Sequence, residues 1–345
     1  LLMKKKGYEV IGVFMKNWSS QGKGGLGECD WTKERSHAMK IAEILNIPLL
    51  TFDFEKEYRR DVIEKMFQNY KMGFTPNPDI DCNEKVKFPL LIKTAKKLNA
   101  DFVVTGHYAR IKKKSGKFIL LRARDESKDQ SYFLYRIRQK ELEKTLFPIG
   151  DYTKKQVREI AKINGFPNHD KKSTVGICFI GKINLKRFLK KRIKPKIGEI
   201  LDPSGRVIGK HDGIYYYTIG QRIGPRYGIE ISKSSDSKKQ LRRWYIASKN
   251  AKRNEIVAAP EGDKLNFRKE IILRRPHWIS KIPKGNVKVL ARIRQVGELL
   301  PSTLKHSNNE YNMILDKSIT GISEGQACVL YKGREVLGGG EIRFK

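Results

Sequence analysis

The segment Tyr8-Glu-Val-Ile-Gly-Val-Phe14 is apolar and follows a break at Gly7, so it predicts a buried β-strand. A second apolar segment, Leu49 to Phe54, predicts another strand. Apolar residues recur at helical spacing between these strands and again after the second, at Ala38, Ile41, Ala42 and Leu45, then at Tyr58, Val62, Met66 and Tyr70. Because strands that alternate with helices are typical of a parallel sheet covered by helices, we expect an α/β domain here.

Later segments continue this pattern and then change it. Phe102 to Thr105 predicts a further strand, and Thr153 to Gln156 forms a capping box for a helix that ends at Gly165. Beyond Pro195 the apolar period changes toward two, which indicates β structure. We therefore expect an α/β domain at residues 1–194, a small mostly-β domain at 195–258 and a β domain at 259–345 that closes as a sandwich or barrel.

The charge of the chain indicates its class of partner. Its 345 residues include 72 Lys and Arg against 37 Asp and Glu, a formal net charge of +35. Since this charge is spread along the chain with aromatic residues among it, a polyanion is favoured, RNA or DNA first and an anionic membrane surface second. No apolar run approaches the roughly 18 residues of a membrane span, so no membrane helix is predicted.

Cysteine usage points to individual thiols rather than to metal or disulfide sites. The four cysteines show no CxxC and no zinc-ligand spacing, so no metal site is predicted. With no signal-peptide pattern, we expect a reducing compartment, the cytoplasm or alternatively a mitochondrion. Cys29 and Cys328 lack chemically distinctive neighbours and are predicted to be structural.

The loop Gly73-Phe-Thr-Pro-Asn-Pro-Asp-Ile-Asp-Cys-Asn83 is the first candidate site. Its two prolines fix the backbone on either side of Asn77, and the loop leads to Cys82 at the expected start of a helix. A helix N-terminus lowers the pKa of a thiol, whereas Asp79 and Asp81 oppose that effect. A turn with a half-buried cysteine is the alternative.

A second thiol, Cys178, lies in an apolar run between Gly176 and Gly181, after two lysines. Positive charge nearby would stabilise a thiolate or a persulfide anion. The alternative is a buried strand in which Cys178 is a core residue.

Two further motifs could contact nucleotides or RNA. Gly106 and His107 follow a predicted strand, where α/β sheets bind ligands, although a lone histidine can equally be structural. Lys128-Asp-Gln-Ser-Tyr-Phe-Leu134 combines charge, amide and aromatic groups, which suits nucleic-acid contact or an ordinary capped helix.

Taken together and in order, these motifs resemble the tRNA-specific 2-thiouridylases. The resemblance covers the whole chain and rests on Val13-Phe-Met-Lys-Asn-Trp18, the Gly73 to Asn83 loop, Thr105-Gly-His-Tyr-Ala-Arg110, Lys128 to Leu134, Val175-Gly-Ile-Cys-Phe-Ile-Gly181, Tyr217-Thr-Ile-Gly-Gln-Arg222, Trp244-Tyr245 and Leu337-Gly-Gly-Gly340. It implies a Rossmann-like PP-loop ATPase domain, a small central mostly-β domain and a C-terminal β-barrel. Another PP-loop enzyme is disfavoured by the Gly73 to Asn83 loop.

The resemblance implies a reaction as well as a fold. Members of this family replace the O2 oxygen of the tRNA wobble uridine with sulfur, using ATP with Mg²⁺ and a persulfide from a sulfur-donor protein. Adenylation makes the oxygen a leaving group that a sulfur nucleophile can displace. By resemblance Cys178 accepts the sulfur, Cys82 forms a transient disulfide with it, and Asp79 is a general acid or base.

The remaining site residues are also carried over from the family's motifs. Asn77, Pro78 and Asp79 match the loop that touches the target base, and Met15 and Gly106 match contacts to ATP. The positions that match tRNA contacts are His107, Lys128, Asp129, Gln130, Arg292, Ile293 and Gln326, although Ile293 stands where an aromatic residue is expected.

One family motif does not occur in this chain. Family members carry a phosphate-binding SGGxDS loop, whose backbone N–H groups hold the ATP phosphates, before the first segment seen here. We interpret the sequence as lacking this upstream segment of the native protein. The alternative is a non-catalytic tRNA-binding homologue without the phosphate loop, which would bind RNA but not thiolate it.

Overall fold

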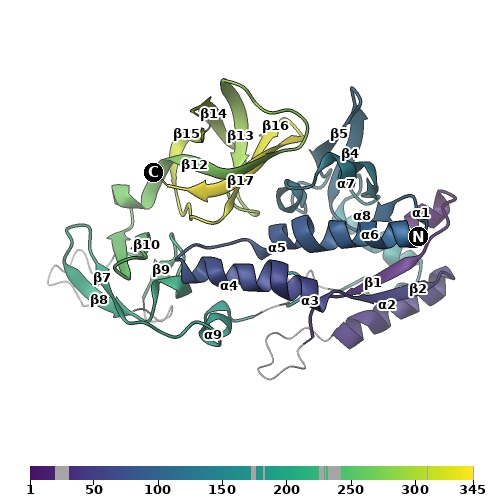
Figure 1. Ribbon diagram of the computed structural model, residues 1–345, viewed down its shortest axis with the longest axis horizontal. Coiled ribbons are helices and arrows are strands. Elements are labelled where there is room, and N and C mark those ends of the chain that lie inside the picture. The colour runs from purple at the N-terminus through teal and green to yellow at the C-terminus, as the bar shows by residue number, and fades with distance from the viewer. Residues whose placement is uncertain are drawn as a thin grey trace.

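The computed structural model describes residues 1–19, 31–171, 176–181, 183–224, 229, 231, 242–308 and 310–344. Three regions are visible in Figure 1: an α/β region at the N-terminal end, a central β region and a β-barrel above the long helices. The prediction of an α/β domain followed by a central β domain and a C-terminal barrel is confirmed. The exact boundaries between the domains stay a prediction.

The α/β region contains two short parallel strand pairs, as its alternating pattern predicts. Strand β1 pairs with β2, with Gly12 opposite Leu49, and β3 pairs with β6, with Val103 opposite Thr145. The strands of this region are β1 (Gly12–Lys16), β2 (Leu49–Asp53), β3 (Val103–Val104), β4 (Ala109–Lys114), β5 (Lys117–Arg122) and β6 (Thr145–Leu146). Its helices are α1 (Leu2–Lys5), α2 (Trp31–Leu45), α3 (Glu55–Tyr58), α4 (Glu64–Lys71), α5 (Pro78–Asp81), α6 (Phe88–Lys97), α7 (Gln139–Glu143), α8 (Lys154–Ile163) and α9 (Leu185–Lys190).

The first strand differs from its prediction. It begins at Gly12 rather than Tyr8, and all five of its residues are only half-buried. Tyr8 is 44% exposed and packs edge-on against Phe102. The prediction of a buried strand from Tyr8 was therefore wrong, because among the described residues β1 hydrogen-bonds to β2 alone and the residues before Gly12 form no ladder.

Two helical segments beside the barrel contain π-helical turns. The π turn Arg59–Ile63 joins α3 to α4, and the π turn Cys82–Lys87 joins α5 to α6. The predicted apolar face of the first segment is confirmed, since it is buried at Tyr58, Val62, Met66 and Tyr70. In Figure 1, α5 and α6 run in one line beneath the barrel and next to α4.

The central region is a five-stranded sheet in the order β8-β7-β11-β10-β9. Its strands are β7 (Gly198–Leu201), β8 (Val207–His211), β9 (Arg222–Ile223), β10 (Trp244–Asn250) and β11 (Glu255–Pro260). Buried residues of this sheet, such as Ile246 and Ile256, share one apolar core with Tyr58 and Cys82 of the α/β region. The central sheet is therefore packed directly against the helices that carry the first candidate thiol.

The C-terminal strands close into a six-stranded barrel. Each strand pairs with its neighbours, and β12 also pairs with β17, which completes the ring. The strands are β12 (Phe267–Trp278), β13 (Asn286–Arg292), β14 (Leu300–Ser307), β15 (Glu310–Thr320), β16 (Ala327–Lys332) and β17 (Glu335–Arg343). Glycines in β17 permit the closure, since a Cβ on Gly338 would lie 2.0 Å from the His277 carbonyl oxygen and one on Gly339 would lie 2.3 Å from that of Cys328.

The barrel is also joined to the α/β region through its sheet. Strand β17 pairs with β5, with Val336 opposite Leu120, so the hairpin β4–β5 extends the barrel sheet to eight strands. A separate apolar core beneath this joint contains Leu120, Tyr132 and Tyr331. No local sequence pattern predicts this pairing, which fixes the barrel relative to the candidate site.

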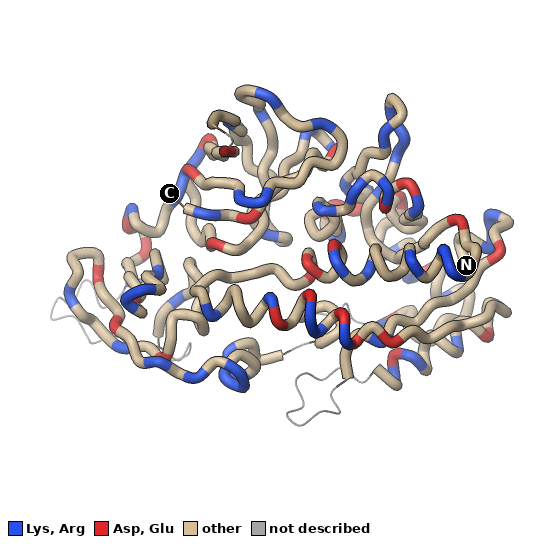
Figure 2. Tube along the Cα trace, in the orientation of Figure 1, with Lys and Arg blue, Asp and Glu red and all other residues tan. Residues whose placement is uncertain are grey.

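Charge is spread over all three regions. Figure 2 shows Lys and Arg on the helices, the central sheet and the barrel rather than in one tail. None of the helices in the described ranges has both the length and the apolar character needed to cross a membrane.

Candidate functional site

The first candidate thiol lies inside a helical segment rather than at its beginning. Asn77 is the N-cap of α5, its side-chain oxygen accepting a hydrogen bond from the Ile80 N–H at 3.4 Å, and Pro78 occupies the first turn. Cys82 follows this turn and begins the π turn to α6. The expectation of a thiol activated by a helix N-terminus is therefore wrong, because the helix begins four residues earlier.

The second thiol lies in a tight loop rather than in a strand. Ile177 and Gly181 pair as an isolated bridge, and the turn between them contains Cys178. Phe179 takes the left-handed conformation, with φ of 67°, which is unfavourable for a bulky aromatic residue. Tyr58 donates a hydrogen bond to the Cys178 carbonyl oxygen at 2.5 Å. The alternative of a buried strand is contradicted, and the loop is held in a strained turn at its cysteine.

The structure brings Cys178, Cys82 and Asp79 together. The Cys178 N–H donates to a carboxylate oxygen of Asp79 at 2.9 Å, and Cys82 lies close enough to Cys178 for each thiol to shift the pKa of the other. Neither cysteine is in a disulfide. A third group, the Lys87 ammonium, lies 3.8 Å from the Cys178 sulfur. Residues far apart in sequence therefore form one compact cluster of two thiols, one carboxyl and one cation.

The two thiols differ in their acidity. A hydrogen bond from Cys82 lowers the pKa of the Cys178 thiol, and Lys87 lowers it further against the opposing effect of burial. The same hydrogen bond, together with burial, raises the pKa of the Cys82 thiol well above its ordinary value. Cys178 is therefore the more acidic thiol of the pair, and Cys82 is the thiol that holds its proton more strongly.

The carboxyl and the amine of the cluster also have shifted acidities. Burial raises the pKa of Asp79, although the Cys178 N–H and Lys87 oppose this shift. Burial alone would lower the pKa of Lys87, but the field of Cys178, Cys82 and Asp79 raises it above its ordinary value. Lys87 therefore stays charged, while Asp79 can take up a proton more readily than an exposed carboxyl.

The loop that leads to Asn77 is held by the barrel. The Thr75 N–H donates to the Glu324 carbonyl oxygen at 2.8 Å, and the Gln326 amide donates to the Thr75 carbonyl oxygen at 3.0 Å. Gly325 must be a glycine here, since its φ is +91° and an added Cβ would lie 2.9 Å from the Thr75 nitrogen. Gln326, predicted to contact tRNA, thus holds the loop that carries the predicted base-contacting residues.

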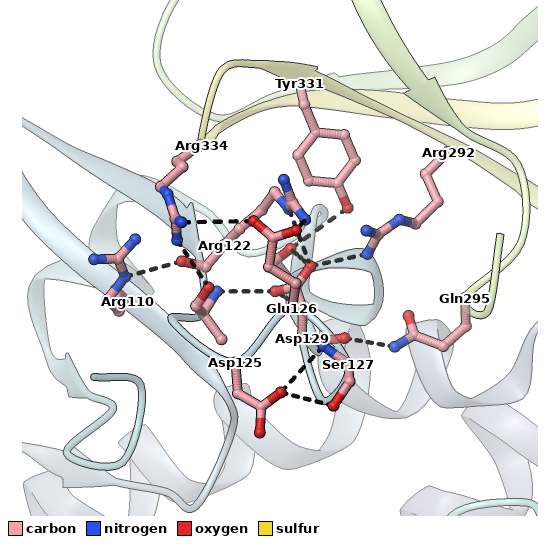
Figure 3. Close-up of polar contacts among 12 residues, drawn as sticks. Arg110, Arg122, Asp125, Glu126, Ser127, Asp129, Arg292, Gln295, Tyr331 and Arg334 are labelled. Atoms are coloured by element: carbon pink, nitrogen blue, oxygen red, sulfur yellow. Dashed lines mark hydrogen bonds and ion pairs between the residues drawn. The ribbon is translucent and has the colours of Figure 1, made fainter. Parts of the chain in front are cut away.

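A buried ion-pair network joins the α/β region to the barrel (Figure 3). The Asp129 carboxylate accepts hydrogen bonds from the Ala123 N–H at 3.0 Å and from Arg292 at 2.9 Å, and Arg122 lies 3.7 Å away. The Gln295 amide donates to the Asp129 carbonyl oxygen at 2.5 Å. Since Arg292 and Gln295 come from the barrel, Asp129 connects the two regions.

His107 occupies an aromatic pocket inside the protein. Its ring packs against Phe88 and Phe147, with centroids 5.6 and 5.7 Å away, and its Nδ1 bonds to the Thr105 hydroxyl at 2.8 Å. Burial, followed by the charge of Lys87, lowers the pKa of His107 well below its ordinary value. His107 is therefore a neutral, buried group, and this position fits the alternative that it has a structural role.

The predicted tRNA contacts are not all on the surface. Lys128 is exposed, and Gln130 and Gln326 are partly exposed. Four others are buried, namely His107, Asp129, Arg292 and Ile293. In this conformation Asp129 and Arg292 join the two regions, His107 lies in its aromatic pocket and Ile293 lies in the barrel core. None of the four presents its side chain to solvent, so their direct contact with tRNA stays a prediction. The three base-contact positions Asn77, Pro78 and Asp79 are partly exposed.

The predicted nucleotide contacts end neighbouring strands. Met15 lies one residue before the end of β1, and Gly106 lies two residues after β3. Both therefore lie at carboxyl ends of parallel strands, where α/β sheets bind ligands. Within the described ranges, no group of three or more His, Cys, Asp or Glu side chains could share a metal ion. Cys328 is buried in the barrel core, whereas Cys29 lies outside the described residues.

Lys87 and Tyr58 had no predicted role at this site. The π turn places Lys87 five residues after Cys82 on the same side of the helix, a spacing that an ordinary α-helical pattern does not predict. Tyr58 was predicted only as part of an apolar face, because its hydroxyl partner lies 120 residues away. The sequence predicted a cation near the thiols from the two lysines that precede the Cys178 loop, and not from Lys87.

Comparisons with known proteins cover the whole chain. Three family descriptions match in order: the tRNA methyl transferase HUP domain at residues 1–182, the tRNA methyl transferase PRC-barrel domain at 186–260 and the aminomethyltransferase beta-barrel domain at 268–342. The chain is 38% identical to the tRNA-specific 2-thiouridylase MnmA 2 of Aliarcobacter butzleri, over 100% of this chain and 94% of that protein. It is likewise 38% identical to MnmA of Ruthia magnifica and 39% identical to MnmA of Coxiella burnetii, each over 93% of the relative.

Proposed function

The chain belongs to the family of tRNA-specific 2-thiouridylases and is an enzyme of that kind, and on this premise we propose that it replaces O2 of the tRNA wobble uridine with sulfur carried on Cys178. The observation that supports this chemistry best is the placement of two free thiols, of which Cys178 is the more acidic, beside a carboxyl and a cation. Such a pair suits sulfur transfer, whereas the methyl transfer named in two of the family descriptions needs no second thiol.

The first step activates the uridine. ATP, with Mg²⁺, would transfer its AMP group to the O2 atom and release pyrophosphate, which would turn a poor leaving group into a good one. In this chain Met15 and Gly106 would contact the nucleotide, since both lie at carboxyl ends of parallel strands. Asn77, Pro78 and Asp79 would contact the base after it leaves the anticodon stack, because all three are partly exposed and Asp79 accepts a hydrogen bond from the Cys178 N–H.

The second step transfers sulfur. The Cys178 thiolate takes the outer sulfur of the donor persulfide, which leaves the donor as a thiol and Cys178 as a persulfide. The terminal sulfur attacks C2 of the uridine and displaces AMP. Cys82 then loses its proton to Asp79 and attacks the Cys178 sulfur, so the S–S bond to the transferred sulfur breaks and a Cys82–Cys178 disulfide forms. The two thiols are oxidised while the transferred sulfur is reduced, so the electrons balance.

The partners follow from the same scheme. The net charge of +35, spread over all regions, attracts a tRNA backbone, and exposed Lys128 is the predicted contact least restricted by the fold. A sulfur-donor protein must reach Cys178, and the disulfide must be reduced after each turnover. We therefore place the reaction in a reducing compartment, the bacterial cytoplasm.

The test is a thiolation assay with cysteine variants. Protein in its native length is incubated with tRNA, Mg-ATP and a persulfide donor, and 2-thiouridine is measured by mass spectrometry. Cys178→Ser and Cys82→Ser are expected to abolish the product, and Cys328→Ala, the matched control with a buried thiol remote from the cluster, is expected to retain it. Product from Cys178→Ser would refute the scheme. Tight, salt-sensitive tRNA binding without ATP turnover would instead identify the non-catalytic homologue.

A further inference from the structure

We propose that Lys87 is a catalytic residue of this site, the cation that holds Cys178 as a thiolate and then holds the negative charge of its persulfide. The proposal rests on the proposed sulfur transfer. It adds a residue that the sequence motifs left without a role. The observation behind it is the distance of 3.8 Å between the Lys87 ammonium and the Cys178 sulfur.

The position of Lys87 is fixed by its surroundings. Its ammonium lies over the ring of Phe179, 5.4 Å from the centroid, and Phe179 packs edge-on against Tyr58. Tyr58 in turn donates to the Cys178 carbonyl oxygen. The aromatic side chains therefore hold the cation on one side and the cysteine loop on the other, so the distance between amine and sulfur does not depend on a flexible surface side chain.

The other basic side chains that the structure describes near the pair have different partners. Lys85, on the same π turn, and Lys65 face Asp81 instead, and Lys65 forms an ion pair with it. Lys171, which precedes the cysteine loop and was predicted to supply its positive charge, pairs with Glu34. Among the residues that the structure describes, Lys87 is therefore the cation in contact with the Cys178 sulfur.

The charged and titratable groups that face this sulfur come from several elements. They are Asp79 on α5, Cys82 and Lys87 on the π turn, and, one step away through Lys87, His107 after β3. Burial lowers the pKa of His107, whereas the hydrogen bond to Cys178, together with burial, raises that of Cys82, so Lys87 is the positive charge and Asp79 the opposing negative charge. Removing the Lys87 charge leaves a buried thiolate beside a carboxyl, which favours protonation of Cys178.

The chemical consequence concerns the uptake of sulfur. Transfer requires the Cys178 thiolate to attack the outer sulfur of the donor, which forms the Cys178 persulfide and releases the donor thiol. A persulfide anion carries its charge on the terminal sulfur, one bond farther from the backbone. A lysine ammonium is a compact point charge with three rotatable donors, so from one position it can stabilise the charge on either sulfur, and one cation serves both states.

The test measures the thiolate directly and does not need thiolation activity. The rate at which iodoacetamide alkylates Cys178 is followed from pH 5 to 10 by peptide mass spectrometry. The neutral variants are Lys87→Met and Lys87→Gln, Lys87→Arg keeps the charge, and Lys93→Met on the exposed side of α6 is the matched control. Thermal unfolding reports whether each variant folds.

Loss of the cation is expected to move the pH midpoint of alkylation upward in both neutral variants. Below both midpoints the rate then falls by about tenfold for each unit of that movement. The midpoint of Lys87→Arg is expected to stay nearer that of the wild type, and the midpoint of Lys93→Met to coincide with the wild-type midpoint. The inference is overturned if a folded neutral variant keeps the wild-type midpoint, or if Arg and Met shift it equally. A shifted midpoint in a protein that makes no 2-thiouridine would refute the proposed function alone.

Discussion

Replacing Asp129 by Asn should weaken the connection between the α/β region and the barrel. One carboxylate oxygen of Asp129 accepts from the Ala123 and Ser131 N–H groups, and the other accepts from the Ser131 hydroxyl and Arg292. In Asp129→Asn an NH₂ group replaces the second oxygen and faces the Arg292 guanidinium, donor against donor. The Ser131 hydroxyl can rotate to accept from it, but Arg292 cannot.

The size of the effect follows from burial. The side chains of Asp129 and Arg292 are 0% and 7% exposed, and that of Arg122, the second arginine of the network, is 9% exposed. Leaving a buried charge without its partner costs about 3–5 kcal/mol. If the closed state loses about 3 kcal/mol of stability, the open state becomes on the order of 100-fold more populated.

Hydrogen exchange measures this opening locally, which suits a chain of several domains that need not unfold in one step. Amides in residues 122–134 should exchange on the order of 100-fold faster in Asp129→Asn, in proportion to the opening equilibrium. Glu126→Gln is the matched control, because Glu126 pairs with the same Arg122 at 3.1 Å but is 56% exposed. Its expected cost is about 0–1 kcal/mol.

The double variant Asp129→Asn, Arg292→Met separates the ion pair from simple loss of packing. Since it removes one of the unpaired charges, it should lose less stability than the sum of the two single variants. Equal exchange in Asp129→Asn and Glu126→Gln would refute the reasoning, because it would show that the buried carboxylate contributes no more than an exposed one.

Three further outcomes are expected. Cys82→Ala removes the largest cause of the lowered pKa of Cys178, so the pH midpoint of Cys178 alkylation should rise; an unchanged midpoint would contradict this. Gln326→Ala loosens the Thr75 loop, so the rate of tRNA thiolation should fall by about tenfold or more, while the free energy of unfolding should fall by only about 1 kcal/mol. Full activity of this variant would show that the barrel does not position the loop. Burial alone would raise the pKa of Asp212, but hydrogen bonds from Lys190, Tyr217 and Lys186 hold it at about 2. Its stabilising effect is therefore present above its ordinary pKa of about 3.9 and lost as the pH falls toward 2, so thermal unfolding of Asp212→Asn should depend less on pH over that range.

Local patterns predicted much of the fold. The Thr153 capping box is present, with the Thr153 hydroxyl accepting from the Gln156 N–H, and α8 ends just before Gly165. These features depend on residues a few positions apart, which is the range over which propensity and capping act. The pairing of β17 with β5 depends on contacts more than 200 residues apart, and no local pattern encodes it.

Local patterns likewise predicted only part of the candidate site. The motifs predicted both thiols and Asp79 as candidate site residues, but they did not predict how the fold shifts the pKa values of these groups. A helix N-terminus was expected to lower the pKa of Cys82, against Asp79 and Asp81, whereas the hydrogen bond to Cys178 and burial raise it. The acidity of a thiol depends on neighbours that only the folded chain supplies, here Lys87 through a π turn and the Cys178 loop from 96 residues away. Burial of Asp129 and Arg292 is likewise a product of tertiary packing.

The most direct test of sulfur transfer through Cys178 and Cys82 is the number of disulfides formed per thiolated nucleotide. Protein of native length, loaded with persulfide on Cys178 and freed of reductant, is mixed with tRNA and Mg-ATP, quenched in acid and analysed by mass spectrometry. The account predicts one Cys82–Cys178 disulfide for each 2-thiouridine, with the reaction stopping after a single turnover. Formation of 2-thiouridine while both cysteines remain reduced would contradict it.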